Sequence, residues 1–482
     1  MFKKSVAIGV ALLFLSSTGS AAEFKIGGVY TAWGQSQHTF LLQEDAYDQN
    51  YAVQMLRFNV QGIANDYAKF VTRVDIAQGW WGVDNALRSI ERTGTSGGSA
   101  MFDYKDTNFL VHVDQAYADF TLKQYPINFK VGRQWYGLGH KLMVDNNYDG
   151  FKIGVGKCFT FGWAKVSEGA DNTDDSYDVG SNIDNRDADL YMAEYKGKAS
   201  NVEYSAFGFY YKDLGIEDGK AYIHDNLQFF KTRFSPQITE LMAFGATAKY
   251  TAGKLTVDGE FNYLTGKDEI DNLSYAGKKP DSYDLNNGDL SGFNLYLKAD
   301  YAAAEAFSLG AVLGLGSGDD DLTQGAGNVN KLRTSGFFYI TEIWEDSIMP
   351  DEEGITPQGL GAPNVRGYRE LENTTILQLN ATYKGIPKTS VFVSGSLIMA
   401  TQPVAAWGAD TTGAIVIDNN TNATDLGTEV DFKVDYQVVD NVSFSLRGGY
   451  FMPGDAAGYL INGNINNLDP AWETKAVLLL KF

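Results

Sequence analysis

The chain has 482 residues, a formal net charge of −21 at pH 7 and a single cysteine, Cys158. The strong acidic balance argues against nucleic acid as a partner, because a phosphate backbone is held by clustered basic side chains. One cysteine excludes an intramolecular disulfide. Tyr and Phe are plentiful, at 28 and 29 residues, and 52 glycines accompany them. This mixture is typical of strands with aromatic ends joined by polar loops.

The N-terminus predicts export from the cytoplasm. Lys3 and Lys4 precede an apolar stretch at 6–15, and small residues follow at 19–22. This order is that of a secretory signal peptide, so we expect 1–22 to be removed and 23–482 to form the mature protein. Beyond it, no apolar run reaches the ~20 residues that a transmembrane helix needs.

From residue 23 onward, segments of about ten residues alternate in polarity, as expected of strands. About eighteen such segments can be counted, an even number that brings both ends of a barrel to one side. The expected strands are 23–32, 52–63, 68–79, 109–122, 127–135, 150–155, 158–167, 188–196, 202–212, 243–252, 255–266, 292–301, 307–316, 375–384, 389–399, 428–437, 442–453 and 472–482.

The connections between these strands alternate strictly in length. The short ones are 64–66, 123–126, 156–157, 197–201, 253–254, 302–306, 385–388 and 438–441. The long ones are 33–51, 80–108, 136–149, 168–187, 213–242, 267–291, 317–374, 400–427 and 454–471. Short periplasmic turns and long extracellular loops are typical of an all-β transmembrane antiparallel barrel, and a soluble sandwich has no reason to sort its loops this way. We therefore predict a barrel in the outer membrane.

Two apolar stretches within the long connections could form more than loop. Residues 227–242 are apolar enough for a short helix at the barrel mouth, and 337–348 could fold inward. A cap on the solvent side with no gating role is the alternative for both.

The C-terminal strand 472–482 ends on Phe482 and carries Leu478 and Leu480 on the same face. This ending resembles the insertion signal of outer-membrane barrels, so barrel-assembly machinery is an expected partner. Outer-membrane lipid and lipopolysaccharide are expected around the wall, and a polar solute within it.

Alternation also assigns charged side chains to the lumen, because a lysine or arginine facing lipid at mid-depth would cost ~2–4 kcal/mol. Four bases on early strands could form a basic stripe that attracts anions, and late-strand acids could pair with them. Mutually compensating ion pairs that merely hydrate the pore are the alternative. The pore-lining candidates are Arg57, Lys69, Arg73, Asp75, Lys130, Arg133, Asp258, Glu260, Lys298, Asp300, Glu429, Asp431, Lys433, Asp435, Arg447, Glu473 and Lys475.

Several short motifs resemble the alginate-export-type outer-membrane porins. They are Gly-Arg-Gln at 132–134, Ser-Gly-Asp at 317–319 followed by Phe337-Phe338, and the hairpin 429–455. The resemblance implies an eighteen-stranded barrel. In alginate exporters a constriction rich in arginine and lysine selects the polyuronate.

Enzymatic and cofactor chemistry is not expected. No His-x-x-x-His or Cys-x-x-Cys-His spacing supports zinc or covalent haem. His112 and Asp114 are the nearest approach to a catalytic pair. The alternative is that they are simply two polar residues that line the lumen. The run Asp319, Asp320 and Asp321 could bind Ca²⁺, with a solvated loop as the alternative.

The sequence therefore predicts a porin that passes polar or charged small solutes passively. An exporter of an anionic, alginate-like polysaccharide and a sheath for a periplasmic partner are the alternatives. A ring of arginine and lysine at one depth of the lumen would favour the polysaccharide exporter. Pairs of acidic and basic side chains would favour a general porin.

Overall fold

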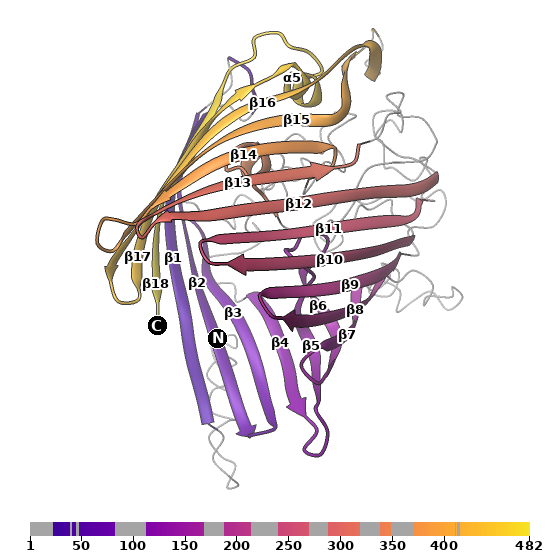
Figure 1. Cartoon of the computed structure of the whole chain (residues 1–482), viewed down its shortest axis with the longest axis vertical. Helices are drawn as coiled ribbons and strands as arrows, with labels where there is room; N and C mark the ends of the chain where they lie inside the picture. Colours follow the sequence, from indigo (N-terminus) through magenta and orange to yellow (C-terminus); the bar gives the residue numbers. More distant parts are fainter. Residues whose placement is uncertain are drawn as a thin grey trace, which may run out of the picture.

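The computed structural model describes residues 23–38, 41–44, 48–81, 112–167, 188–213, 240–268, 288–318, 338–348, 371–409, 411 and 415–482. These residues form one sheet of eighteen strands, each antiparallel to the next (Figure 1). The strands are β1 (Glu23–His38), β2 (Asp48–Asn65), β3 (Ala68–Trp80), β4 (His112–Thr121), β5 (Ile127–Gly137), β6 (Asp145–Val155), β7 (Phe159–Ser167), β8 (Ala188–Ala199), β9 (Val202–Asp213), β10 (Glu240–Ala252), β11 (Leu255–Asp268), β12 (Gly288–Ala304), β13 (Phe307–Gly316), β14 (Thr374–Tyr383), β15 (Thr389–Ala409), β16 (Ile415–Val439), β17 (Val442–Pro453) and β18 (Ala471–Lys481).

The sheet closes on itself through its first and last strands. β1 pairs with β18 from Val29↔Lys481 to His38↔Trp472. The main chains of Gly28 and Phe482 exchange two further hydrogen bonds, of 2.8 and 3.0 Å. Closure leaves no unpaired edge, which is the condition for strands to cross a hydrocarbon layer. The predicted eighteen-stranded antiparallel barrel is confirmed.

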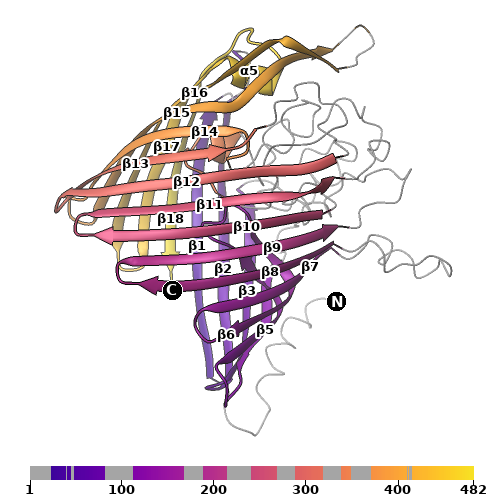
Figure 2. The ribbon, with the colours of Figure 1, turned by 45° about the vertical axis from the view of Figure 1, so that its right-hand side comes forward.

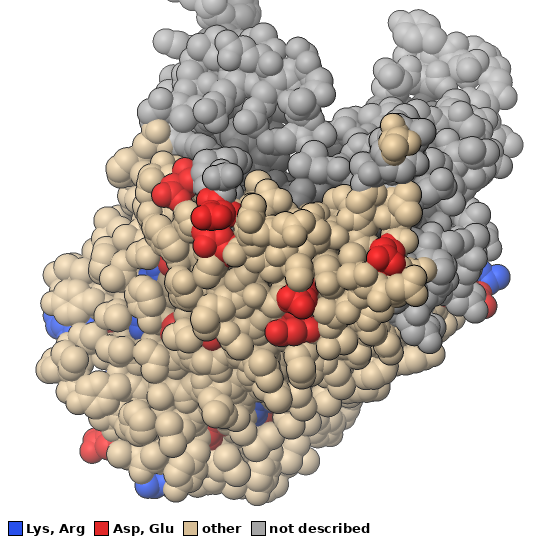
Figure 3. Space-filling view, turned by 90° about the horizontal axis from the view of Figure 1, so that it is seen from above, with Lys and Arg blue, Asp and Glu red and all other residues tan. Residues whose placement is uncertain are grey.

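Large apolar side chains cover the outer face of this barrel. Phe244, Phe261 and Leu379 are 60%, 48% and 73% exposed. Uncharged side chains make up most of the described outer wall that is visible in Figure 3. Exposed apolar rows on a closed barrel indicate a lipid-facing wall.

Two helical segments lie among the described residues, the π-helix η4 (Trp344–Ile348) and the α-helix α5 (Asp455–Asn462). No helix in this part of the chain is long and apolar enough to cross a membrane. Helix α5 lies within 454–471, which was predicted as a long connection, and it ends at Gly463, whose φ of 75° is the left-handed conformation that favours glycine. A helix was predicted within 227–242. Residues 227–239 are not among the described residues, and residues 240–242 belong to β10.

The predicted long connection 400–427 is wrong for most of its length. β15 and β16 continue through it as a hairpin that pairs Val404 with Ala423 and Trp407 with Ile417. Its register shifts at three places, and such bulges erase the period-two pattern from which a strand is read. The Trp407 Nε1 donates to the Tyr459 carbonyl at 2.7 Å, which holds α5 against this hairpin.

Two other predicted long connections are much shorter than expected. β1 extends to His38 and β2 starts at Asp48, so only 39–47 joins these two strands. β6 starts at Asp145, so only 138–144 joins β5 to β6. Glycine and glutamine in 34–37, and asparagine in 146–147, do not resemble strand residues, but they pair with neighbouring strands. Pairing partners overrode weak local propensity in these segments.

Candidate functional site

Residues 338–348, between β13 and β14, fold inward and dock on the wall formed by β16–β18. The main-chain N–H groups of Ile343 and Trp344 donate to the two carboxylate oxygens of Glu429 at 2.6 and 2.9 Å. Trp344 is fully buried and stacks on Phe451 with ring centroids 5.2 Å apart. The inward fold predicted for 337–348 is confirmed over its described part.

Charged side chains of β18 bind the C-terminal end of the inward segment 338–348. Lys475, only 3% exposed, lies 3.2 Å from Asp346 and 2.7 Å from Glu473. The Ser347 hydroxyl donates to Glu473 at 2.8 Å. Buried charges persist only when they are paired and hydrogen-bonded, so this network holds one arrangement of the segment.

A second inward segment, 138–144, reaches β11 from the β5–β6 hairpin. The His140 Nδ1 lies 2.8 Å from Glu260 and its Nε2 lies 3.0 Å from Asp258. The hydrogen bond with Glu260 is the main cause that raises the pKa of His140 above its usual value. Gly139 has a φ of 52°, and a side chain there would collide with Glu260. The contact of His140 with Glu260 therefore requires a glycine at position 139.

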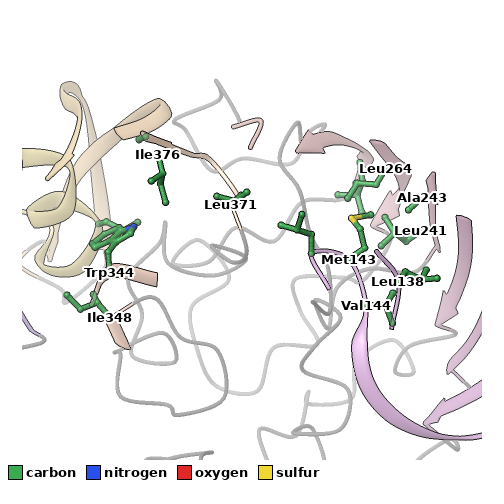
Figure 4. Packing of buried hydrophobic residues seen from close by; sticks show 14 of the residues in the cluster. Leu138, Met143, Val144, Leu241, Ala243, Leu264, Trp344, Ile348, Leu371 and Ile376 are labelled. Carbon is green, nitrogen blue, oxygen red and sulfur yellow. The ribbon is translucent and has the colours of Figure 1, made fainter. Parts of the chain in front are cut away.

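Apolar contacts support each inward segment on its own side of the barrel. Figure 4 shows Leu138, Met143 and Val144 grouped with side chains of β10 and β11. It shows Trp344 and Ile348 in a separate group with Ile376. All of these side chains are buried.

Tyr296 on β12 lies between the two segments. Its ring is 5.4 Å from His140 and 4.9 Å from Phe338, measured between centroids. The two inward segments therefore approach each other at one side chain of the wall. Together they narrow the lumen along β11–β18.

The inner wall of β2–β4 carries most of the predicted basic stripe, and its members are paired. Arg57 donates two hydrogen bonds of 2.6 Å to Asp75 and also lies 3.4 Å from Asp114. Arg73 contacts Asp114, and Lys69 lies 3.5 Å from Asp119. Bidentate pairs hold the guanidinium groups in place.

Lys130 and Lys152 lie directly opposite each other on β5 and β6. Among the described residues neither has a carboxylate within 4.0 Å. The Lys130 ammonium lies 5.8 Å from the Tyr117 ring, and that of Lys152 lies 4.8 Å from the Tyr136 ring and donates to the Trp135 carbonyl. Aromatic faces and a carbonyl stabilise a cation without neutralising it.

The remaining candidates form short-range pairs along the wall. Lys298 and Asp300 are 3.1 Å apart, Lys433 and Asp435 3.4 Å, Arg133 and Asp149 3.7 Å, and Arg447 and Glu342 3.7 Å. Asp431 accepts a hydrogen bond from Ser394 at 3.2 Å.

The expected pairing of the late-strand acids with the basic stripe is wrong. Asp435 and Glu473 pair with neighbouring lysines, and Glu473 also binds the inward segment. The acids that neutralise the stripe are Asp75, Asp114 and Asp119, which are close to it in the sheet.

Several predictions cannot be placed, and several important residues were missed. Residues 1–22, the His112 side chain and the acidic run 319–321 lie outside the described residues. Reasoning from sequence missed His140, Tyr296 and Asp346, because their partners are far away in the chain. The only usable signal was the apolar stretch 337–348.

No family model matches the chain, and no curated protein matches its sequence. Solved structures match its fold over 95% of its length and 98% of theirs: Pseudomonas aeruginosa OccK8 (OprE) at 10% identity and a TM-score of 0.53, Acinetobacter baumannii OccAB2 at 10% and 0.52, and Pseudomonas aeruginosa OccK2 (OpdF) in complex with glucuronate at 10% and 0.50. These matches support an eighteen-stranded barrel of the outer-membrane porin type and do not single out the alginate-export family. With the apolar outer wall, this fold places the chain in a bacterial outer membrane.

Proposed function

We propose that the protein is a passive outer-membrane channel for small polar solutes that carry a carboxylate or similar anionic group. The observation that carries this proposal is the excess of bases on the inner wall of β2–β6. On the described part of this wall the six bases Arg57, Lys69, Arg73, Lys130, Arg133 and Lys152 face four acids, Asp75, Asp114, Asp119 and Asp149. A local excess of positive charge in a narrow lumen concentrates anions.

Small solutes are favoured over a polymer. The inward segments 138–144 and 338–348 narrow the lumen, and the candidate bases other than Lys130 pair with acids. Mixed pairs are the arrangement that the sequence analysis assigned to a porin for small solutes, and the alginate-like exporter has no support from the comparisons. OccK2, which shares this fold, is named in complex with glucuronate, a small sugar acid. A sugar acid is therefore a suitable first probe.

The outer-membrane context adds two proposals from the sequence. Residues 1–22 serve as the export signal, and the strand that ends at Phe482 engages the barrel-assembly machinery. A catalytic function is not proposed, and the lumen charges described above have the structural roles of ion pairs and tethers.

Planar-bilayer recording tests the channel. We expect conductance, and a reversal potential under a salt gradient that reports preference for anions. Swelling of proteoliposomes should be faster in glucuronate than in a neutral sugar of similar size. K130Q/K152Q should lose the anion preference, whereas K157Q/K254Q, at two exposed turn lysines, should keep it. Absence of conductance, or cation preference in the unaltered protein, would refute the proposal.

A further inference from the structure

Three neighbouring strands, β13, β14 and β15, contain no Asp, Glu, Lys, Arg or His. Every other strand in the described part of the chain carries at least one such residue. The three strands lie side by side in the upper half of Figures 1 and 2, between the charged strands β12 and β16. We call the lumen-facing side of β13–β15 the neutral wall.

The neutral wall presents hydroxyl and amide groups to the lumen. Gln378 marks the inner face of β14, because its Nε2 donates to the Ile340 carbonyl of the inward segment at 3.0 Å. Side chains alternate across a strand, and the sheet register carries this face to the two neighbouring strands. The half-buried polar side chains that remain in contact with the lumen are Ser308, Asn380, Thr382 and Ser390.

The wall holds its central amide in one orientation. The Asn380 Nδ2 donates to the Gln378 Oε1 at 3.2 Å, so the Asn380 Oδ1 points away from Gln378 as a hydrogen-bond acceptor. Gly310 lies directly opposite Asn380, and a side chain at this glycine would collide with the Asn380 Oδ1. The hydroxyl groups of Ser308 and Thr382 lie opposite each other one step nearer the short turn.

The unpaired lysines lie on the opposite side of the lumen. β4–β6 are halfway around the eighteen-stranded ring from β13–β15, and β5 and β6 appear in the lower half of Figures 1 and 2. β5 carries Lys130 and β6 carries Lys152. Lys130 and Asn380 are each the fourth residue from the short-turn end of their strands. The same half of the barrel therefore has a cationic side and an uncharged, hydrogen-bonding side.

A solute in this half of the lumen meets different chemistry on its two sides. A carboxylate is attracted by the field of Lys130 and Lys152. On the neutral wall, an apolar chain would cover hydroxyl and amide groups without replacing their hydrogen bonds to water, which costs free energy. Hydroxyl groups both donate and accept, so a hydroxylated chain replaces those hydrogen bonds.

We propose that the channel selects carboxylates that carry several hydroxyl groups over apolar carboxylates of the same chain length. This inference rests on the proposed function as a channel for anionic solutes, and it names the class of anion. Lys130 and Lys152 set the preference for negative charge. Ser308, Asn380 and Thr382 discriminate among the carboxylates.

Reversal potentials in planar bilayers measure this selection, with potassium gluconate on one side and potassium hexanoate at equal concentration on the other. Gluconate should permeate about two- to tenfold better, which is the factor that one hydrogen bond contributes. S308A/T382V should lower this ratio by about twofold or more, and N380A should lower it in the same direction. The matched control is S443A/T256V, which removes the same two kinds of hydroxyl from lumen-facing positions on β17 and β11 and should keep the ratio.

Each variant is first checked for native barrel mobility on unheated gels. Equal or lower permeability of gluconate in an unaltered protein that still prefers anions over cations would overturn this inference and leave the proposed channel standing. An unchanged ratio in both S308A/T382V and N380A would overturn the role of the neutral wall. Cation preference or absence of conductance in the unaltered protein would instead reject the proposed function.

Discussion

Replacing Glu429 with glutamine tests whether the segment 338–348 sets the width of the pore. The Glu429 carboxylate is 1% exposed and accepts hydrogen bonds from the main chain of Ile343 and Trp344. Glutamine keeps one acceptor and turns an N–H₂ group toward the other N–H. The loss is one hydrogen bond, and a buried N–H is left without its acceptor, which costs about 1–3 kcal/mol. At about 1.4 kcal/mol per tenfold, the equilibrium between docked and undocked segment should shift by roughly five- to a hundredfold.

Single-channel recording in planar bilayers measures this shift. We expect E429Q to show higher mean conductance and more current noise than the unaltered protein, because the undocked segment no longer narrows the lumen. E203Q is the matched control, since Glu203 is an exposed residue at the start of β9, paired with Lys198 at 2.7 Å. A correctly folded E429Q barrel with unchanged conductance and noise would refute the assignment of this segment to the constriction.

Three further predictions concern other parts of the molecule. The pKa of His140 is raised in the folded protein, so its ion pair with Glu260 is complete below about pH 6.5 and is lost as pH rises through the higher folded-state pKa. Conductance of the unaltered protein should therefore increase above neutral pH. Conductance of H140Q should stay level over the same pH range. Substituting only one of Lys130 and Lys152 with glutamine should reduce the anion preference about half as much as substituting both, measured by reversal potential, and an unchanged value in both would contradict their role. Truncating Phe482 to alanine removes its edge contact with Phe58, at 5.7 Å, and should lower the yield of assembled barrel in cells, with total synthesis as the control.

The barrel itself could be predicted because its signal is local. Alternation of Phe58 with Arg57, or of Leu480 with Lys481, depends only on the period of two in a strand. The long hairpin β15–β16 could not be predicted, because its three register shifts break that period. Helix α5 could not be predicted from alternation, because its eight residues, Asp455–Asn462, do not follow a period of two.

The candidate site was predictable only as a set of inward-facing side chains. The partner of Arg57 lies in the adjacent strand, and alternation placed both Arg57 and Asp75 on the same face. The partner of His140 lies 120 residues away, and those of Glu429 lie 86 and 85 residues away. No pattern in the chain reports which of many acids a distant loop will contact.

By itself, the sequence determined the compartment and the class of fold, because both depend on local order and on the cost of charge in lipid. The tertiary structure alone decided which charges neutralise one another and which loops enter the lumen. Those choices depend on closure of β1 against β18 and on the register around the ring, which bring Glu260 to His140 and Glu429 to Ile343. They also leave Lys130 beside Lys152 with no carboxylate among the described residues within ion-pair distance. Long-range contacts of this kind form only in the folded barrel.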